Sequence, residues 1–260
     1  TTQDILDTGL TLQIKEAYEI IYRKMIKLED ILLGLAEKHK HTVMMGRTHG
    51  QHAVPITFGF KVAGWAYELR DHIERFKEMK KRLFVMKLSA ACGARNTFVF
   101  LMGKEKTHEM VKRVAERIGL GNPPGDLALR TDRFAECVNN LALLVTLLGK
   151  MGLEVRDLQR TEMGEVEEPW DSAKQYSSST MPNKRNPEPS EWQHGLGKLA
   201  RANALVMMDI QMAGERDATR MGPEMASIPD TFGYADAALN QGIRIFGGLV
   251  VHTDRMKQNL

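Results

Sequence analysis

Apolar residues recur three and four positions apart along most of the chain. This period places them on one face of a helix, so each segment that carries it is predicted to be an amphipathic helix. No segment shows the convincing alternation of apolar and polar residues that is typical of a half-buried strand. We therefore predict an all-α protein, an elongated bundle of about five long helices. The predicted helices cover residues 10–38, 57–86, 105–118, 130–160 and 187–213, with a last one from about residue 230.

The predicted helices are longer than a small compact domain needs. At about 1.5 Å per residue, the segment 57–86 would span about 45 Å. Their apolar stripes are also broad, and Met207, Met208 and Met212 lie within one and a half turns. Because an elongated bundle has much surface and little interior, we expect these stripes to pack against other subunits. The alternative is that each helix is buried in the core of a single chain.

The composition is typical of a soluble globular domain. The 260 residues are 43% hydrophobic and 27% charged, with a net charge of +3. So small a charge does not indicate a nucleic-acid partner. The basic residues from Lys77 to Arg82 share helical spacing with Glu74 and Glu78, which is typical of a solvated helix face.

No stretch reaches about 18 uninterrupted apolar residues, so we expect no membrane-spanning helix and no membrane partner. The first ten residues lack the basic and apolar regions of a signal peptide. Cys92 and Cys137 lie far apart and lack metal-ligand spacing. These features predict a cytoplasmic protein without a disulfide framework. The sequence contains no zinc signature, phosphate-binding glycine loop or dinucleotide fingerprint.

The stretch SSSTMPNKRNP, residues 177–187, interrupts the helical pattern with hydroxyl groups, prolines and two cations. Asn186 can cap the helix that follows, and Pro187 suits its first position. The residues before them are more polar than a short turn requires, and they are typical of a lid that closes over a ligand. A serine there could act as a base only if loop N–H groups and a nearby cation stabilised its alkoxide. Lys184 could be that cation, or it could bind a carboxylate.

Two other stretches carry candidate chemistry. GRTHGQHAVP, residues 46–55, gathers Thr48, His49 and Gln51 in a predicted loop just before a helix. Composition alone leaves open whether the histidine is catalytic or structural. The start of the chain, TTQD, offers two hydroxyl groups and an amide, which are suited to holding a carboxylate.

Together the three stretches resemble motifs of the fumarase/aspartase superfamily. SSSTMPNKRNPEPSE is similar to its signature GSSxMPxKxNPxxxE, GRTHGQHAVPITFG resembles its first-helix motif, and TTQDILDT resembles its S/T-S/T-polar-D motif. The motifs occur in the family's order and spacing. The resemblance implies a homotetramer whose central helical bundle places residues from three subunits in each active site. It also implies a β-elimination that releases fumarate, or its cycloisomerase variant, with no metal and no organic cofactor.

The resemblance implies a role for each matching position. Ser178 matches the general base that removes a proton from the carbon next to a carboxylate. His49 matches the histidine that assists protonation of the leaving group, and Glu191 matches its charge-pairing partner. The family's usual glycine before the base is Ser177 here. The implied substrate-binding positions are Lys184 and Asn186 for the aci-carboxylate, Thr48 and Gln51 beside the histidine, the trio Thr1, Thr2 and Gln3, and Arg216.

Two branches of the superfamily fit parts of the chain. GRTHG, the MPNKRNP segment and GERD resemble adenylosuccinate lyases, which cleave a C–N bond in purine biosynthesis. That branch holds a nucleotide phosphate five and nine positions after Arg216, where this chain has Met221 and Met225, and Arg220 is the candidate replacement. ERDATRMGPEMASIPD instead resembles the 3-carboxy-cis,cis-muconate cycloisomerases of aromatic catabolism. We place the adenylosuccinate-lyase-like reaction first, because His49 and the KRNP pair match that branch.

The resemblance covers the family's central helical domain, to which residues 1–260 are assigned. Family members reach the TTQD motif after an N-terminal domain and carry a small C-terminal domain, and both are mostly absent from this sequence. A non-catalytic bundle kept for assembly is therefore the alternative of another class. Retention of Ser178, Lys184 and His49 argues against it.

Overall fold

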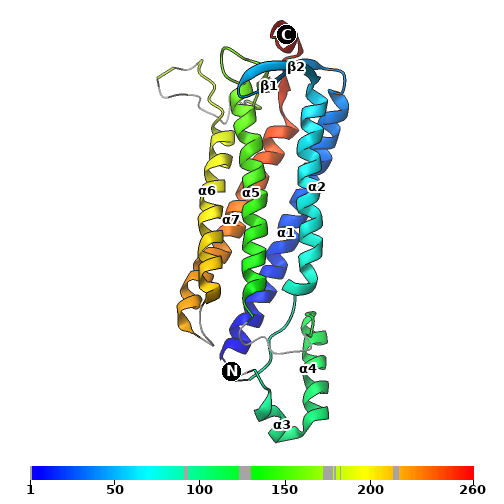
Figure 1. Ribbon diagram of the computed structural model, residues 1–260, viewed down its shortest axis with the longest axis vertical. Helices are drawn as coiled ribbons and strands as arrows, with labels where there is room; N and C mark the ends of the chain where they lie inside the picture. Colours follow the sequence, from blue (N-terminus) through cyan, green and yellow to red (C-terminus); the bar gives the residue numbers. More distant parts are fainter. Residues whose placement is uncertain are drawn as a thin grey trace.

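The computed structural model describes residues 2–90, 93–122, 130–171, 178, 180–181, 183–212 and 217–260. Within these ranges, five long helices lie side by side along the long axis of an elongated bundle (Figure 1). This arrangement confirms the all-α prediction. The long helices are α1 (Thr2–Lys38), α2 (Phe58–Leu83), α5 (Asp132–Leu158), α6 (Glu188–Asp209) and α7 (Met221–Gly247).

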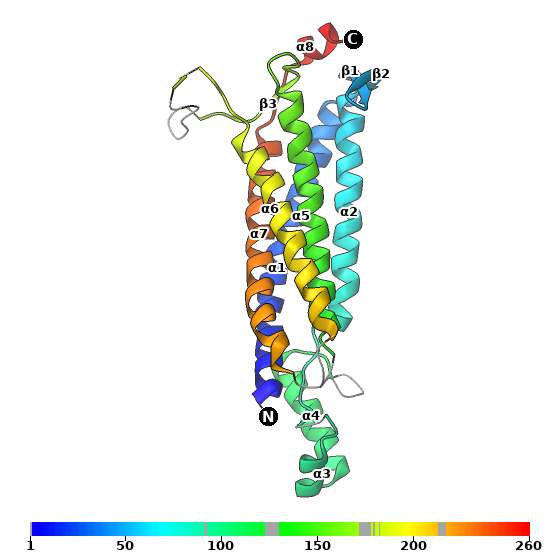
Figure 2. The ribbon, with the colours of Figure 1, turned by 60° about the vertical axis from the view of Figure 1, so that its left-hand side comes forward.

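Three shorter helices lie at the ends of the bundle. α3 (Asn96–Met102) and α4 (Lys104–Ile118) project beyond the end at which the chain starts (Figure 2). α8 (Thr253–Gln258) lies at the opposite end, together with the C-terminus. Two 3-10 turns, Ile210–Met212 and Ala218–Arg220, flank the connection between α6 and α7.

The apolar core runs along the bundle between the long helices. Leu32 of α1, Phe76 of α2 and Leu144 of α5 are fully buried members of it. By length and composition α5 could cross a membrane, but 61% of its most apolar window is buried inside the bundle. A long apolar helix that is mostly covered by its neighbours is typical of the core of a large protein.

Two helix boundaries differ from the prediction for different physical reasons. α1 begins at Thr2 and not near residue 10, because its buried face there carries the polar residues Asp4, Asp7 and Thr11, which an apolar period does not reveal. α7 begins at Met221 and not near residue 230, because Pro229 lies in its interior, where proline does not usually occur. α3 was not predicted at all, since none of its residues is buried.

The prediction of no strands is wrong for residues 43–57. β1 (Val43–Thr48) and β2 (Gln51–Thr57) form an antiparallel hairpin with an irregularity between Met45 and Arg47. Most of β2 is exposed on both faces, so burial gives it no alternating pattern. A second, very short pair joins β3 (Val166–Glu167) to β4 (Val250–Val251).

Candidate functional site

The hairpin presents His49 at its tip. Thr48 pairs with Gln51, so only His49 and Gly50 form the turn, with φ of 53° and 73°. Two-residue turns with two positive φ values match the twist of a hairpin, and histidine enters this region more readily than most residues. Thr48, His49 and Gln51 are all exposed at the end of the bundle that holds the C-terminus (Figure 1).

A buried ion pair holds this hairpin in place. The Arg47 guanidinium donates to both carboxylate oxygens of Glu165, Nη1 to Oε2 at 2.9 Å and Nη2 to Oε1 at 2.6 Å. Glu165 is fully buried and also accepts a hydrogen bond from the Asn259 side chain at 2.8 Å. Such bidentate pairs fix orientation as well as distance. Neither Arg47 nor Glu165 was singled out from the sequence. The acidic run GEVEEP, which contains Glu165, was the feature that could have pointed to them.

We expect Arg47→Lys to loosen the hairpin. Lysine keeps the charge but cannot form the bidentate pair with Glu165, so the free energy of unfolding should fall by about 1–3 kcal/mol. The exposed Arg23, which bonds only the carbonyl of Glu19 four residues earlier, supplies the control. Arg23→Lys should change stability by less than about 0.5 kcal/mol. Urea unfolding of the full-length protein would measure both, and equal losses would contradict the assigned role of the pair.

The same acidic run also anchors the serine-rich segment. Glu167 accepts from Arg185 at 2.5 Å, and Glu168 accepts from both the backbone N–H and the hydroxyl of Ser190. Burial raises the pKa of the Glu168 carboxyl, against the lowering effect of its bonds to Ser190. These contacts place the start of α6, and with it the exposed Glu191, beside β3.

The predicted cap of α6 is wrong. The capping position is occupied by Pro187, without a side-chain hydrogen bond, and the helix begins at Glu188. Asn186 lies before that position and is half-buried. The orphan N–H of Ser190 is satisfied instead by the Glu168 carboxylate, which lies far from α6 in sequence.

Ser178 has one of the two features that the sequence required of a serine base, namely backbone N–H groups on its oxygen. Its Oγ accepts hydrogen bonds from the backbone N–H groups of Thr180 and Met181, both at 3.2 Å. Backbone donors aimed at an oxygen stabilise negative charge on it. The backbone N–H of Lys184 donates to the Met181 carbonyl at 3.1 Å and closes a turn within the loop, and Lys184 itself is exposed. The neighbouring Ser177 lies outside the described residues.

The other candidate segment lies at the opposite end of the bundle. Thr2 is exposed at the start of α1, and Gln3 is buried with 8% of its surface exposed. Thr1 and Arg216 lie outside the described residues. Since α1 has 37 residues, its two ends are about 55 Å apart. Thr2 and Gln3 therefore cannot meet the hairpin or the serine-rich segment of the same chain.

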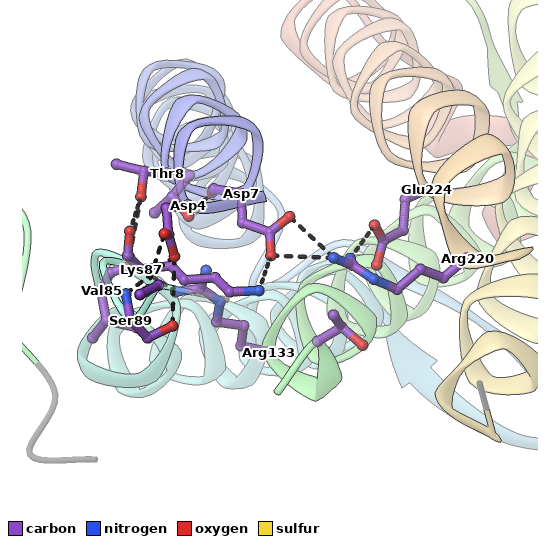
Figure 3. A network of polar contacts seen from close by, with 12 residues as sticks. Asp4, Asp7, Thr8, Val85, Lys87, Ser89, Arg133, Arg220 and Glu224 are labelled. Carbon is purple, nitrogen blue, oxygen red and sulfur yellow. Dashed lines mark hydrogen bonds and ion pairs between the residues drawn. The ribbon is translucent and has the colours of Figure 1, made fainter. Parts of the chain in front are cut away.

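A buried polar network starts at Asp7, one turn after Gln3 on α1 (Figure 3). The Asp7 carboxylate accepts from Lys87 at 2.8 Å and from Nη2 of Arg220 at 3.2 Å, and Nη1 of Arg220 donates to Glu224 at 2.6 Å. The pKa of Arg220 is raised, because the effects of Glu224 and Asp7 outweigh burial, which lowers it. Arg220 is 4% exposed and paired at both ends of its guanidinium. These pairs argue against the predicted role of Arg220 as a replacement phosphate anchor.

The arrangement thus separates Thr2 and Gln3 from the other described candidate residues, which lie at the opposite end of the bundle. Across the described ranges, no hydrogen bond or ion pair joins His49 to Ser178, Lys184 or Glu191. Nor does any group of three or more His, Cys, Asp or Glu in those ranges have the arrangement of a metal site.

The apolar stripe of α6 divides between the core and the surface. Met207 is fully buried, whereas Met208 and, in the 3-10 turn that follows α6, Met212 are 51% and 89% exposed. Other large apolar side chains on the surface of α6 belong to Trp192, Leu199, Leu205 and Val206. Large exposed apolar surfaces of this kind mark sites of association.

Comparison with known proteins gives a family and several relatives. Residues 1–202 match the Lyase family. The chain is 43% identical to an adenylosuccinate lyase of Methanocaldococcus jannaschii and 36% identical to an N-acetyl-S-(2-succino)cysteine lyase of Dickeya dadantii. Each alignment covers 100% of this chain and 56% of the relative. The chain therefore spans about half the length of these curated relatives.

A solved structure with the same fold is the 3-carboxy-cis,cis-muconate lactonizing enzyme of Pseudomonas putida. Its TM-score is 0.91 at 33% identity, over 100% of this chain and 56% of that chain. The long-helix bundle described above is thus an architecture shared with an enzyme named for a lactonizing reaction, whereas the relatives compared by sequence are named lyases.

Proposed function

Because the chain belongs to the Lyase family, and with it to the fumarase/aspartase superfamily, we propose that the full protein releases fumarate from a succinyl-type substrate by β-elimination. The observation that carries this proposal is the pair of backbone N–H groups on the Ser178 oxygen. A serine hydroxyl is a weak base, and donors of this kind favour its alkoxide.

The proposed step moves one proton at each end of the substrate. The Ser178 alkoxide removes the proton from the carbon next to a carboxylate, and Lys184 and Asn186 stabilise the aci-carboxylate that results. The electron pair then forms the C=C bond of fumarate while the C–N bond breaks. His49, paired with Glu191, gives a proton to the departing nitrogen. Thr48 and Gln51 flank this histidine, and Thr2 and Gln3, with Thr1 and Arg216, hold the second carboxylate.

The proposal requires an assembly of several copies. Gln3 and Ser178 lie near opposite ends of a bundle whose first helix is about 55 Å long, so a complete site takes them from different chains. The exposed apolar side chains of α6 supply surface for such packing. A homotetramer with shared sites accounts for both observations. The assignment of residues 1–260 to one central domain and the cytoplasmic location stay predictions, as does the lack of nucleic-acid and membrane partners.

Among succinyl-type substrates we place adenylosuccinate first. Relatives named adenylosuccinate lyase are 38–43% identical over the whole chain. Cycloisomerase chemistry on 3-carboxy-cis,cis-muconate is the second candidate, favoured by the TM-score of 0.91. A bundle that only assembles, without turnover, is the alternative of another class, and the hydrogen bonds on Ser178 argue against it.

The full-length protein should therefore be incubated separately with adenylosuccinate, with other succinyl compounds and with 3-carboxy-cis,cis-muconate. Formation of fumarate, followed by absorbance and by a coupled fumarase assay, would support the proposal. Conversion of the muconate alone would replace it by the second candidate. Inertness toward every compound would contradict lyase function and favour an assembly role.

A further inference from the structure

A cavity of about 350 Å³ lies between the first turns of α1 and the start of α7. Most of its wall is apolar, from side chains on both helices. At Leu10, Gln13 and Met225 it adjoins a second, almost wholly apolar cavity of about 560 Å³. The apolar residues of the first cavity are Ile5, Leu6, Leu10, Met221 and Met225. This composition suits a ligand with an apolar body and few polar groups.

Two buried polar side chains in the wall have an atom without a partner. Glu224 is 4% exposed, and its Oε1 accepts no hydrogen bond from the described residues, although its Oε2 accepts from Arg220. Gln3 is 8% exposed, and its Oε1 is equally unpaired within the same ranges. A buried carboxylate oxygen without a donor is costly, so it fits a ligand that brings an N–H group. The Gln3 amide can present either its oxygen or its NH₂ group.

The charges of the wall oppose an anion. Its carboxylates are Asp7 and Glu224, and Arg220 is the one cation among the lining residues, all of which are described. Arg220 already donates to both of those carboxylates (Figure 3). A phosphate placed here would lie beside two carboxylates and find no unpaired cation among the lining residues. Arg220 is already bonded to both carboxylates, and Lys87, which does not line the cavity, is bonded to Asp7.

We infer that this cavity receives the leaving-group part of the substrate, and that this part is a non-phosphorylated N–H donor on an apolar body. The inference rests on the proposed function, because Gln3 belongs to the segment proposed to hold a carboxylate of the succinyl group. The N–H group donates to Oε1 of Glu224, and the apolar body packs on Leu6, Leu10 and Met221. The inference keeps the proposed β-elimination but reverses the order of substrates that the relatives' names favour, since it ranks succinyl compounds without a phosphate above adenylosuccinate.

Adenylosuccinate and succinyladenosine are a matched pair of probes, because they differ only in the phosphate. We expect kcat/KM for succinyladenosine to exceed that for adenylosuccinate by about tenfold or more. A lower kcat/KM for succinyladenosine than for adenylosuccinate would overturn the inference while leaving lyase function intact.

Met225→Arg tests the same point by adding a cation. Met225 lines both cavities and is 74% exposed, so the fold should tolerate the change. The ratio of kcat/KM for adenylosuccinate to that for succinyladenosine should rise by about tenfold, whereas Met225→Gln, of similar length without charge, should leave the ratio near that of the parent. An unchanged ratio in Met225→Arg would overturn the inference. So would a loss of assembly in sedimentation, since a second copy would then occupy the cavity.

Failure of the proposed function is separable from failure of this inference. If no compound yields fumarate, calorimetric titration of the full-length protein with adenosine and with AMP still tests the cavity. Tighter binding of adenosine would support the inference. Tighter binding of AMP, or no binding of either at millimolar concentration, would overturn it.

Discussion

Ser178→Ala should lower kcat by about 10²-fold or more while leaving the fold intact. The side chain is half-buried in a loop, and its Oγ accepts two backbone N–H groups that would hold the alkoxide. Alanine removes the oxygen and keeps both donors in the backbone. Turnover of the preferred succinyl substrate, with circular dichroism and thermal unfolding as checks on folding, measures the effect.

A variant in the same loop separates loss of the base from damage to the loop. Thr180→Ala removes a hydroxyl group, but it keeps the Thr180 N–H that donates to Ser178. It should therefore retain most of the parent's activity. Full activity in Ser178→Ala would show that another group takes the proton. Equal losses in both variants would assign the effect to the loop.

The helical period predicted the bundle because most long helices bury an apolar stripe. α2 and α5 follow their predicted segments closely, since residues such as Phe76 and Leu144 lie on the buried face. The first turns of α1 could not be predicted in this way. Their buried face carries Asp4 and Asp7, whose hydrogen-bond partners Ser89 and Lys87 lie 85 and 80 positions further along the chain.

The hairpin escaped prediction for another reason. A strand shows a period of two when one of its faces is buried, and β2 is exposed on both faces over most of its length. Its signal was the turn itself, a histidine and a glycine between Thr48 and Gln51. In the predicted loop these residues had no fixed geometry, whereas the paired strands place His49 at a defined tip.

The candidate site was predicted through its motifs, but its supports were not. The resemblance identified Ser178, His49 and Lys184, because these positions lie within recognisable stretches. Arg47 and Glu165 are 118 positions apart, and a sequence with many acids and bases does not reveal which of them pair. The run from Glu165 to Glu168 was visible as charge alone. The structure shows that it anchors both the hairpin and the segment leading into α6.

The division of the site between chains can be tested by mixing inactive subunits. His49→Ala and Ser178→Ala proteins should each be nearly inactive, because each lacks one of the two proton-transfer groups. If a site takes His49 and Ser178 from different copies, a mixed assembly contains sites in which both are intact. Denaturing the two variants together and refolding them permits random mixing of subunits.

From equal amounts of the two variants, about a quarter of the sites should contain both intact side chains, so up to about a quarter of the parent's activity should return. Mixing Ser178→Ala with Lys184→Met is the matched control. These two residues lie six positions apart in the same loop, so they enter each site from the same copy and no activity should return. Recovery in the first mixture alone would establish shared sites. If neither mixture regains activity although sedimentation shows mixed assemblies, His49 and Ser178 of each site come from one chain. The division between chains would then be restricted to Gln3 and Thr2 at the opposite end of the bundle.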